Sequence, residues 1–143
     1  MSNVKTQSYE NHGQYAPLYH FILAPIALIL FIASIVHIFK EQFSFSSLLI
    51  FGLAVCVVLL GAVVRQFATK LQDRSIVHEE NFRHFRLTGK PLDTRLSVQQ
   101  IIALRFAEDD DFPALCVKAV EAGMNSGTIK KSITNWRADH NRV

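Results

Sequence analysis

The sequence has two long stretches without a single charged side chain. Asp, Glu, Lys and Arg are missing from residues 18–39 and again from residues 43–64. Each stretch is about 20 residues long, which is the length that a helix needs to cross a hydrocarbon core of roughly 30 Å. Two adjacent stretches of this purity disfavour a buried hairpin in a soluble protein. We therefore predict an all-α membrane protein whose transmembrane hairpin has helices at 17–39 and 45–64.

Sequence patterns of known catalytic sites are also missing. There is no glycine-rich phosphate loop, no nucleophile elbow and no His-Glu-x-x-His motif. The charge-free stretches contain no carboxylate, which argues against an ion or proton transporter that acts alone. We therefore expect a protein that is not an enzyme, with no catalytic residues and no cofactor.

Cysteine is scarce as well. The two cysteines, Cys56 and Cys116, lie in a predicted span and in the C-terminal part. A disulfide between them is not expected, and two isolated cysteines do not make a metal site. We interpret both as small apolar side chains and expect no metal.

Basic residues are distributed very unevenly. Of the 15 Lys and Arg residues, 13 lie from Arg65 onward, where they face 10 acidic residues. Because basic residues collect on the cytoplasmic side of membranes, the C-terminal part is predicted to be cytoplasmic. Two spans then place the N-terminus there too, with a short external turn at 40–44. We expect an uncleaved protein of the bacterial inner membrane.

The rest of the chain divides at clear local signals. Residues 1–16 form a polar cytoplasmic lead-in, and Pro25 is expected to bend the first span. No Gly or Pro interrupts the stretch after the second span, so residues 65–87 should extend that helix into the cytoplasm. Gly89 and Pro91 end it. A C-terminal module of three short helices is predicted at 96–143.

Two of these short helices have recognisable starts. Ser97 and Gln100 match a capping box. The acidic run at 108–111 should precede the second helix, and Gly123 should end it. Asn125 or Ser126 should cap a third helix, with Ile129, Ile133 and Trp136 on one face.

Small residues recur every seven positions along the second predicted span: Ser47, Ala54, Gly61 and Ala68. Small side chains on one stripe let helix backbones approach closely. Two alternatives remain open, namely packing against the first span and a seam between two copies of the chain.

The stretch 72–86 (QDRSIVHEENFRHFR) combines charged, histidine and aromatic residues. On a helix, the side chains of this stretch would form two stripes along the helix surface. Glu79–Arg83 and Glu80–His84 are spaced as i,i+4 ion pairs. His78 and His84 point in different directions and cannot share one metal ion. Either this helix packs on the C-terminal module or it binds another protein. The candidate partner-binding residues are Asp73, Arg74, His78, Glu79, Glu80, Phe82, Arg83 and Phe85.

Histidines at the borders of the first span form another candidate. His12 and His20 are eight residues apart at the N-terminal boundary, where a polar contact to a partner is expected. His20 and His37 lie about 25 Å apart along a helix, so they cannot ligate one haem within a chain. An alternative is that one of them binds haem or a metal together with a partner chain.

The C-terminal module suggests a further alternative. The spacing of Ala119, Gly123 and Ile129 resembles a helix-turn-helix motif, in which TIKKSITNWR would be the recognition helix. Lys130, Lys131, Trp136 and Arg137 would then define a DNA-binding surface. The neighbouring acidic run would repel DNA, so nucleic acid is not the expected partner.

Three segments together carry a resemblance: NHGQYAPLYH, QDRSIVHEENFRHF and the C-terminal stretch that ends in IKKSITNWRADHNRV. They resemble an uncharacterised bacterial family of small two-span membrane proteins, a domain of unknown function. The family has no established activity, so the resemblance implies topology and not mechanism. The expectation is a membrane adaptor or accessory subunit that binds the lipid bilayer and another membrane protein or a second copy of itself.

Overall fold

The computed structural model describes residues 16–138. These residues belong to two compact units that divide between Thr69 and Lys70. No strand occurs among the described residues. The elements are the π-helix η1 (Leu18–Leu23) and the α-helices α1 (Ala24–Lys40), α2 (Phe45–Thr88), α3 (Val98–Leu104), α4 (Phe112–Glu121) and α5 (Ser126–Ser132).

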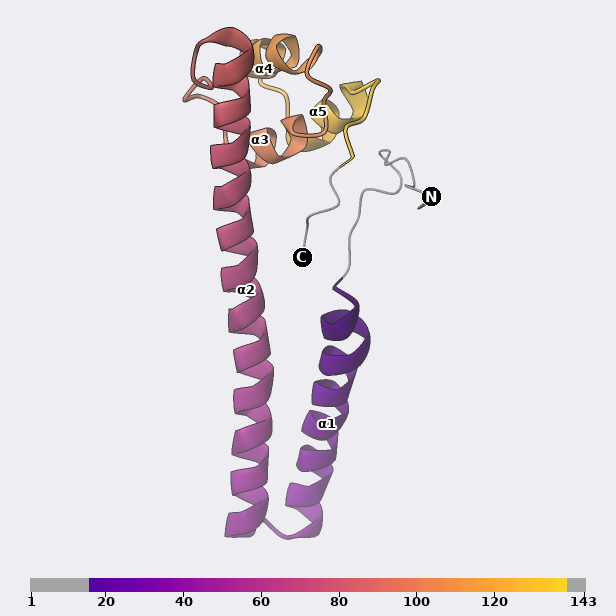
Figure 1. The fold of residues 1–143 in the computed structure, drawn as a ribbon. Helices are drawn as coiled ribbons and strands as arrows, with labels where there is room; N and C mark the ends of the chain where they lie inside the picture. The colour runs from indigo at the N-terminus through magenta and orange to yellow at the C-terminus, as the bar shows by residue number, and fades with distance from the viewer. Residues whose placement is uncertain (1–15, 139–143) are drawn as a thin grey trace, which may run out of the picture. The chain divides into compact units, whose positions relative to one another are not determined.

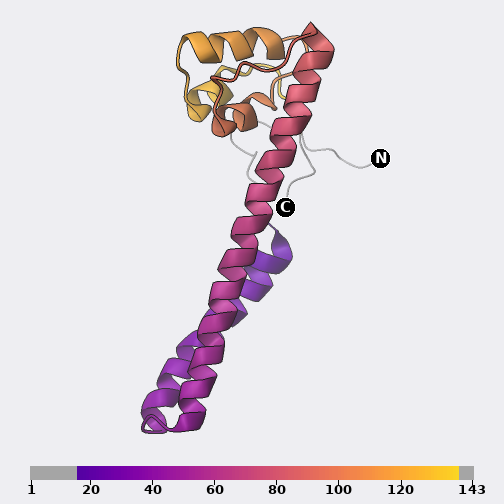
Figure 2. The same ribbon diagram turned by 90° about the vertical axis from the view of Figure 1, so that its left-hand side faces the viewer.

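In the first unit, α1 and the beginning of α2 run in opposite directions and are joined by a short turn (Figures 1 and 2). Leu18–Lys40 and Phe45–Thr88 are both long and apolar enough to cross a membrane. Only 11% and 6% of the residues in their most apolar windows are buried. Most apolar side chains of these windows are therefore exposed.

Pro25 coincides with a change in the hydrogen bonding of the first helix. It is the second residue of α1, and the preceding turn, Leu18–Leu23, is π-helical. The Ala24 N–H donates to the Tyr19 carbonyl, five residues back. A wider turn before a proline rearranges the backbone hydrogen bonds where the ring cannot donate one.

The small residues of the first unit are buried to different degrees, and Ala68 at the end of the stripe is exposed. Ser34 on α1 and Ser47 on α2 are buried, and each hydroxyl donates to a carbonyl of its own chain segment, Phe31 O at 2.7 Å and Ser44 O at 2.8 Å. The rings of Phe31 and Phe51 meet at 5.8 Å between centroids. Of the two alternatives for the small-residue stripe, these contacts favour packing between α1 and α2.

The second unit is built around one apolar core. Figure 2 shows α3, α4 and α5 gathered beside the last turns of α2. Val77 of α2, Leu115, Val120 and Trp136 pack against this core. The buried core residues are Leu92, Leu96, Ile101, Ala103, Leu104, Phe106, Ala107, Phe112, Cys116, Ala119, Met124, Ile129 and Ile133. The module therefore completes its core with its own long helix and includes Leu92, which precedes the predicted start.

Local signals in the sequence place most helix ends. Ser97 and Gln100 form a reciprocal capping box, in which the Ser97 N–H donates to Gln100 Oε1 at 2.8 Å. Gly89 (φ +71°) and Gly123 (φ +56°) adopt the left-handed conformation that ends helices. Asn125 caps α5 by accepting the Thr128 N–H.

The last helix is shorter than the sequence indicates. It ends at Ser132, and Ile133 is already extended, so the predicted recognition helix TIKKSITNWR does not form. Instead, Trp136 pairs with Ala107 in an isolated β-bridge, and the Arg137 N–H donates to Phe106 O at 2.8 Å. The extended backbone brings the indole to 5.0 Å from the Phe106 ring. Core packing therefore overrides the helical spacing at this position.

Candidate functional site

The last turns of α2 have one buried face that is rich in charge. Ile76, Glu80 and Arg83 are buried at i, i+4 and i+7, a spacing that puts all three on one side of a helix. This side faces the C-terminal module, because the partners of Arg83 lie in the segment between α3 and α4.

Arg83 is the centre of this contact. Its Nε donates to Asp109 Oδ1 at 2.6 Å, and its Nη2 donates to the Ala107 carbonyl at 2.7 Å. Its Nη1 donates to Glu80 Oε2 at 3.0 Å and to the Arg105 carbonyl at 3.4 Å. The guanidinium carbon lies 4.3 Å from the centroid of the Phe112 ring. One side chain thus connects α2 to both ends of the turn that precedes α4.

The pKa values of the two carboxylates beside Arg83 are shifted in opposite directions. Burial raises the pKa of Glu80, and the hydrogen bond from Arg83 offsets only part of this effect. The hydrogen bond from Arg83 lowers the pKa of Asp109, which is far more exposed. A buried charge is tolerated only when its hydrogen bonds are complete, so Arg83 and Glu80 depend on each other.

Two further residues of α2 contact the segment that follows this helix. The Asn81 side-chain carbonyl accepts the Leu92 N–H at 2.9 Å. His84 Nδ1 lies 2.8 Å from the Lys90 carbonyl, and its ring meets Phe112 at 6.0 Å. The sequence patterns predict neither of these roles, and they place Asp109 in an acidic run that precedes a helix and would repel DNA. The available signal was Asn81, an amide inside an otherwise strong helix, where it is intrinsically unfavourable.

The predicted ion pairs along α2 are wrong. Glu80 pairs with Arg83 at i,i+3, and not with His84. Arg83 turns toward Asp109, so it does not pair with Glu79, which forms no ion pair within residues 16–138. The guanidinium is held by carbonyls of the module, which a pattern read along a single helix cannot include.

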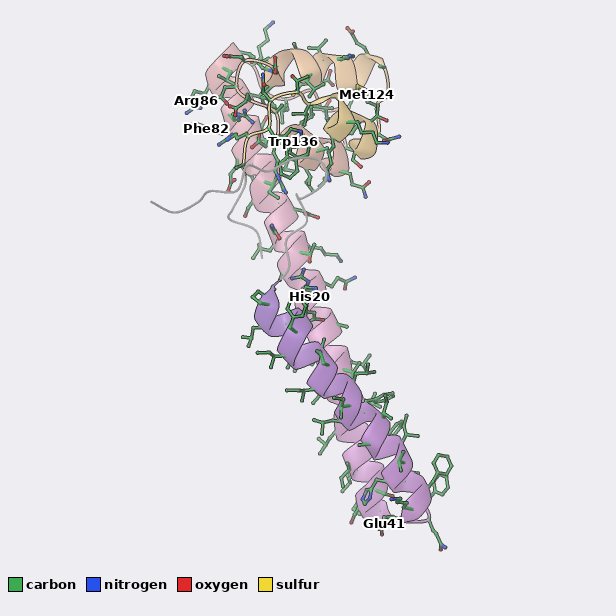
Figure 3. The ribbon with its side chains drawn as sticks, turned by 90° about the vertical axis from the view of Figure 1, so that its right-hand side faces the viewer. His20, Glu41, Phe82, Arg86, Met124 and Trp136 are labelled. Atoms are coloured by element: carbon green, nitrogen blue, oxygen red, sulfur yellow. The ribbon has the colours of Figure 1, made fainter. Side chains whose placement is uncertain are left out.

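The opposite face of α2 is exposed and apolar. Leu71, Phe82 and Phe85 are 67%, 70% and 54% exposed. Arg74, His78 and Glu79 are exposed between and beside them. Figure 3 shows Phe82 and Arg86 on the side of the helix away from Met124. The eight candidate residues therefore do not form one site: Glu80 and Arg83 serve the module, and most of the others form a free surface.

Asp73 takes an intermediate position. It is half-buried and lines a shallow open groove beside the exposed face. The groove residues are Lys70, Asp73, Arg74, Val77, His78 and Val98.

The candidate residues of the C-terminal module separate as well. Lys130 lies with its Nζ 5.8 Å from the centroid of the Phe106 ring, and Trp136 is half-buried on the core. Lys131 and Arg137 are exposed. These four side chains do not share a recognition helix.

At the N-terminal boundary, His12 lies outside the described residues. The His20 ring belongs to the first unit, where Nδ1 is 3.0 Å from the Ala16 carbonyl. Within residues 16–138, no group of three or more His, Cys, Asp or Glu side chains could hold a metal ion. Cys116 is buried, and burial raises the pKa of its thiol to about 12. This thiol is therefore a poor nucleophile at neutral pH.

The described chain is all-helical, with two helices suited to a membrane and a small helical module. The whole chain, residues 1–143, matches the model of a family of unknown function (DUF6526), and it belongs to that family. The expectation of an uncharacterised family is thereby confirmed. No match was found among curated proteins or among solved structures.

We expect Arg83→Ala to destabilise the second unit by about 3–5 kcal/mol, because it leaves Glu80 as an unpaired buried charge. Trp136 is the only tryptophan, and it lies in this unit, so its fluorescence during urea unfolding of the full chain in detergent reports the change. Arg86→Ala is the matched control: its partner is again Asp109, at 3.6 Å, but the pair is exposed. Arg86→Ala should lower the free energy of unfolding by less than about 1 kcal/mol. Equal losses in the two variants would contradict the role given to Arg83.

Glu80 should make the second unit more stable as the pH falls toward 4.5. Its pKa is raised on folding, so the folded state binds more protons than the unfolded state between pH 4.5 and the folded-state pKa. Stability from this group is thus fully present below pH 4.5 and lost as the pH rises through the folded-state pKa. The pKa of Asp109 is lowered on folding, so this carboxyl stabilises the folded state at higher pH. That stabilisation is lost only as the pH falls below about its ordinary pKa of 3.8.

The Glu80→Gln variant isolates this effect. The free energy of unfolding of the native chain, minus that of Glu80→Gln, should increase as the pH is lowered from 7.5 to 5. Urea midpoints of Trp136 fluorescence at three pH values measure the difference. A difference that is constant, or that shrinks toward pH 5, would refute the assignment.

Proposed function

We propose that this chain is a small integral membrane protein, an adaptor or accessory subunit without catalytic chemistry of its own. Residues 17–39 and 45–64 would cross the bacterial inner membrane as a hairpin. The uncovered apolar surface of α1 and of the beginning of α2 supports this arrangement. The excess of Lys and Arg from Arg65 onward favours a cytoplasmic location for both termini.

The exposed face of α2 is the observation that carries the adaptor function. A helix of a small soluble module normally buries its large apolar side chains, yet Leu71, Phe82 and Phe85 are more than half exposed. The Arg83 contacts anchor the opposite side of the same helix to the module. Because the module already has a complete core, these three side chains are available to another protein.

The C-terminal module then has a structural part in this function. It holds the end of α2 through one buried face, which prevents the helix from rotating that face outward. Asn81 and His84 add contacts to the returning segment. The module thereby presents Phe82 and Phe85 in a fixed orientation, as binding surfaces on rigid elements require.

The topology can be tested with membrane-impermeant maleimide. In a Cys56→Ala background, Gln42→Cys in the turn should be labelled in intact cells, since the turn is expected outside. Lys131→Cys, which is exposed on α5, should be labelled only after permeabilisation. Native Cys116 is buried and should stay unlabelled in both variants. Labelling of Lys131→Cys in intact cells would exclude the proposed orientation.

The adaptor function can be tested with a photoactivatable phenylalanine analogue at Phe82 in the membrane of living cells. We expect an adduct of discrete mass, because this face contacts a protein partner. The matched control carries the analogue at Val117, which is 55% exposed on α4, and should give no discrete adduct. Absence of an adduct at Phe82, or the same adducts at both positions, would count against the proposed function.

A further inference from the structure

We propose that the exposed face of α2 binds a second copy of this chain, with the two helices parallel and in register. This inference rests on the proposed function, since it names the partner of the same face. It follows from three features of residues 68–85: a repeat of seven residues, the exposure of every position in that repeat, and one self-complementary pair of charges.

The repeat of seven places two residues of each heptad, the first and the fourth, on the seam. The first position of the heptad is occupied by Ser75 and Phe82. The fourth position is occupied by Leu71, His78 and Phe85. The repeat covers residues 68–85, and its flanking positions include the charged residues Arg74 and Glu79. Charged residues beside a repeat of seven are typical of a coiled coil.

All five of these side chains are exposed in the structure. They lie opposite Ile76, Glu80 and Arg83, which the module covers, so a partner helix can reach them without displacing the module. The position opposite the module is also where the large apolar groups Leu71, Phe82 and Phe85 collect. A second helix would remove this surface from water, which is the main driving force for association outside the membrane.

The charges favour a parallel second copy over an unrelated helix. Arg74 and Glu79 flank the seam on opposite sides and are five residues apart, which is the spacing of ion pairs between parallel helices of a coiled coil. Neither side chain forms an ion pair within residues 16–138. In a symmetric dimer, Arg74 of each copy would meet Glu79 of the other. Two copies in one membrane with one topology also necessarily have parallel helices.

His78 would meet its counterpart at the centre of the seam. A polar layer within an apolar seam fixes the register, because a shift by one heptad would place the imidazole against Leu71 or Phe85. Ser75, one layer away, is small and lets the two helices approach closely. The seam is thus apolar at its ends and polar in its middle.

Disulfide formation in the full chain can test the geometry. The chain is reconstituted into phospholipid vesicles with Cys56→Ala, and Cys116 is kept because it is buried and not readily ionised. Ser75→Cys should form an intermolecular disulfide on mild oxidation, because equivalent seam positions of parallel helices bring two Cα atoms within the 4.4–6.8 Å that a disulfide needs. Lys70→Cys, exposed on the flank of the same helix, is the matched control and should crosslink at least about fivefold less.

Charge exchange tests the choice of a second copy directly. Arg74→Glu and Glu79→Arg should each lower the association constant by about tenfold, since two attractive pairs become repulsive. The double variant, or an equal mixture of the two single variants, should restore association to within about twofold of the native chain. Lys70→Glu makes the same change of charge off the seam and should have no effect.

Two results would overturn the inference. Equal crosslinking at Ser75→Cys and Lys70→Cys would exclude this seam, and so would a double variant no better than either single one. If, in addition, the analogue at Phe82 captures a different protein, the proposed function survives without the second copy. If neither a disulfide nor an adduct forms, both proposals fail.

Discussion

The buried guanidinium of Arg83 is the interaction on which the arrangement of the second unit depends. It donates to a carboxylate in its own helix, to a carboxylate 26 residues away and to the carbonyls of Arg105 and Ala107. A planar group with five donors can satisfy several acceptors at once, which a lysine ammonium at this place could not do in the same geometry. The turn before α4 is therefore built around one cation.

This choice has an energetic consequence for the rest of the helix. A buried ion pair contributes little net stability compared with apolar residues of similar size, but breaking it is costly. Such a contact therefore selects one orientation of α2 against the module more than it strengthens the contact. Rotation of α2 by about half a turn would bring Phe82 and Phe85 to the side that now faces the apolar core. The buried charges of Glu80 and Arg83 oppose that rotation, because they would have to leave their partners.

Much of the fold follows from short-range signals, and most of the candidate site does not. The capping box of Ser97, the left-handed Gly89 and Gly123, and the uninterrupted helix to Thr88 are local features of sequence and appear where they were expected. The contact between Arg83 and Asp109 joins residues far apart, and no local pattern specifies it. Trp136 shows the same limit: its spacing fits a helical face, but the Phe106 ring and the bridge to Ala107 favour extended backbone.

In the sequence, residues 72–86 resemble a single mixed site, because charged and aromatic side chains follow one another along the helix. In three dimensions the module removes Glu80 and Arg83 from that series. What remains outside is Leu71, Phe82 and Phe85, together with Arg74 and Glu79, which form no ion pair within residues 16–138. The exposed surface is thus apolar along its centre, with Arg74 on one flank and Glu79 on the other. A second copy of the chain has the matching pattern, and for this reason it is the proposed partner of this surface.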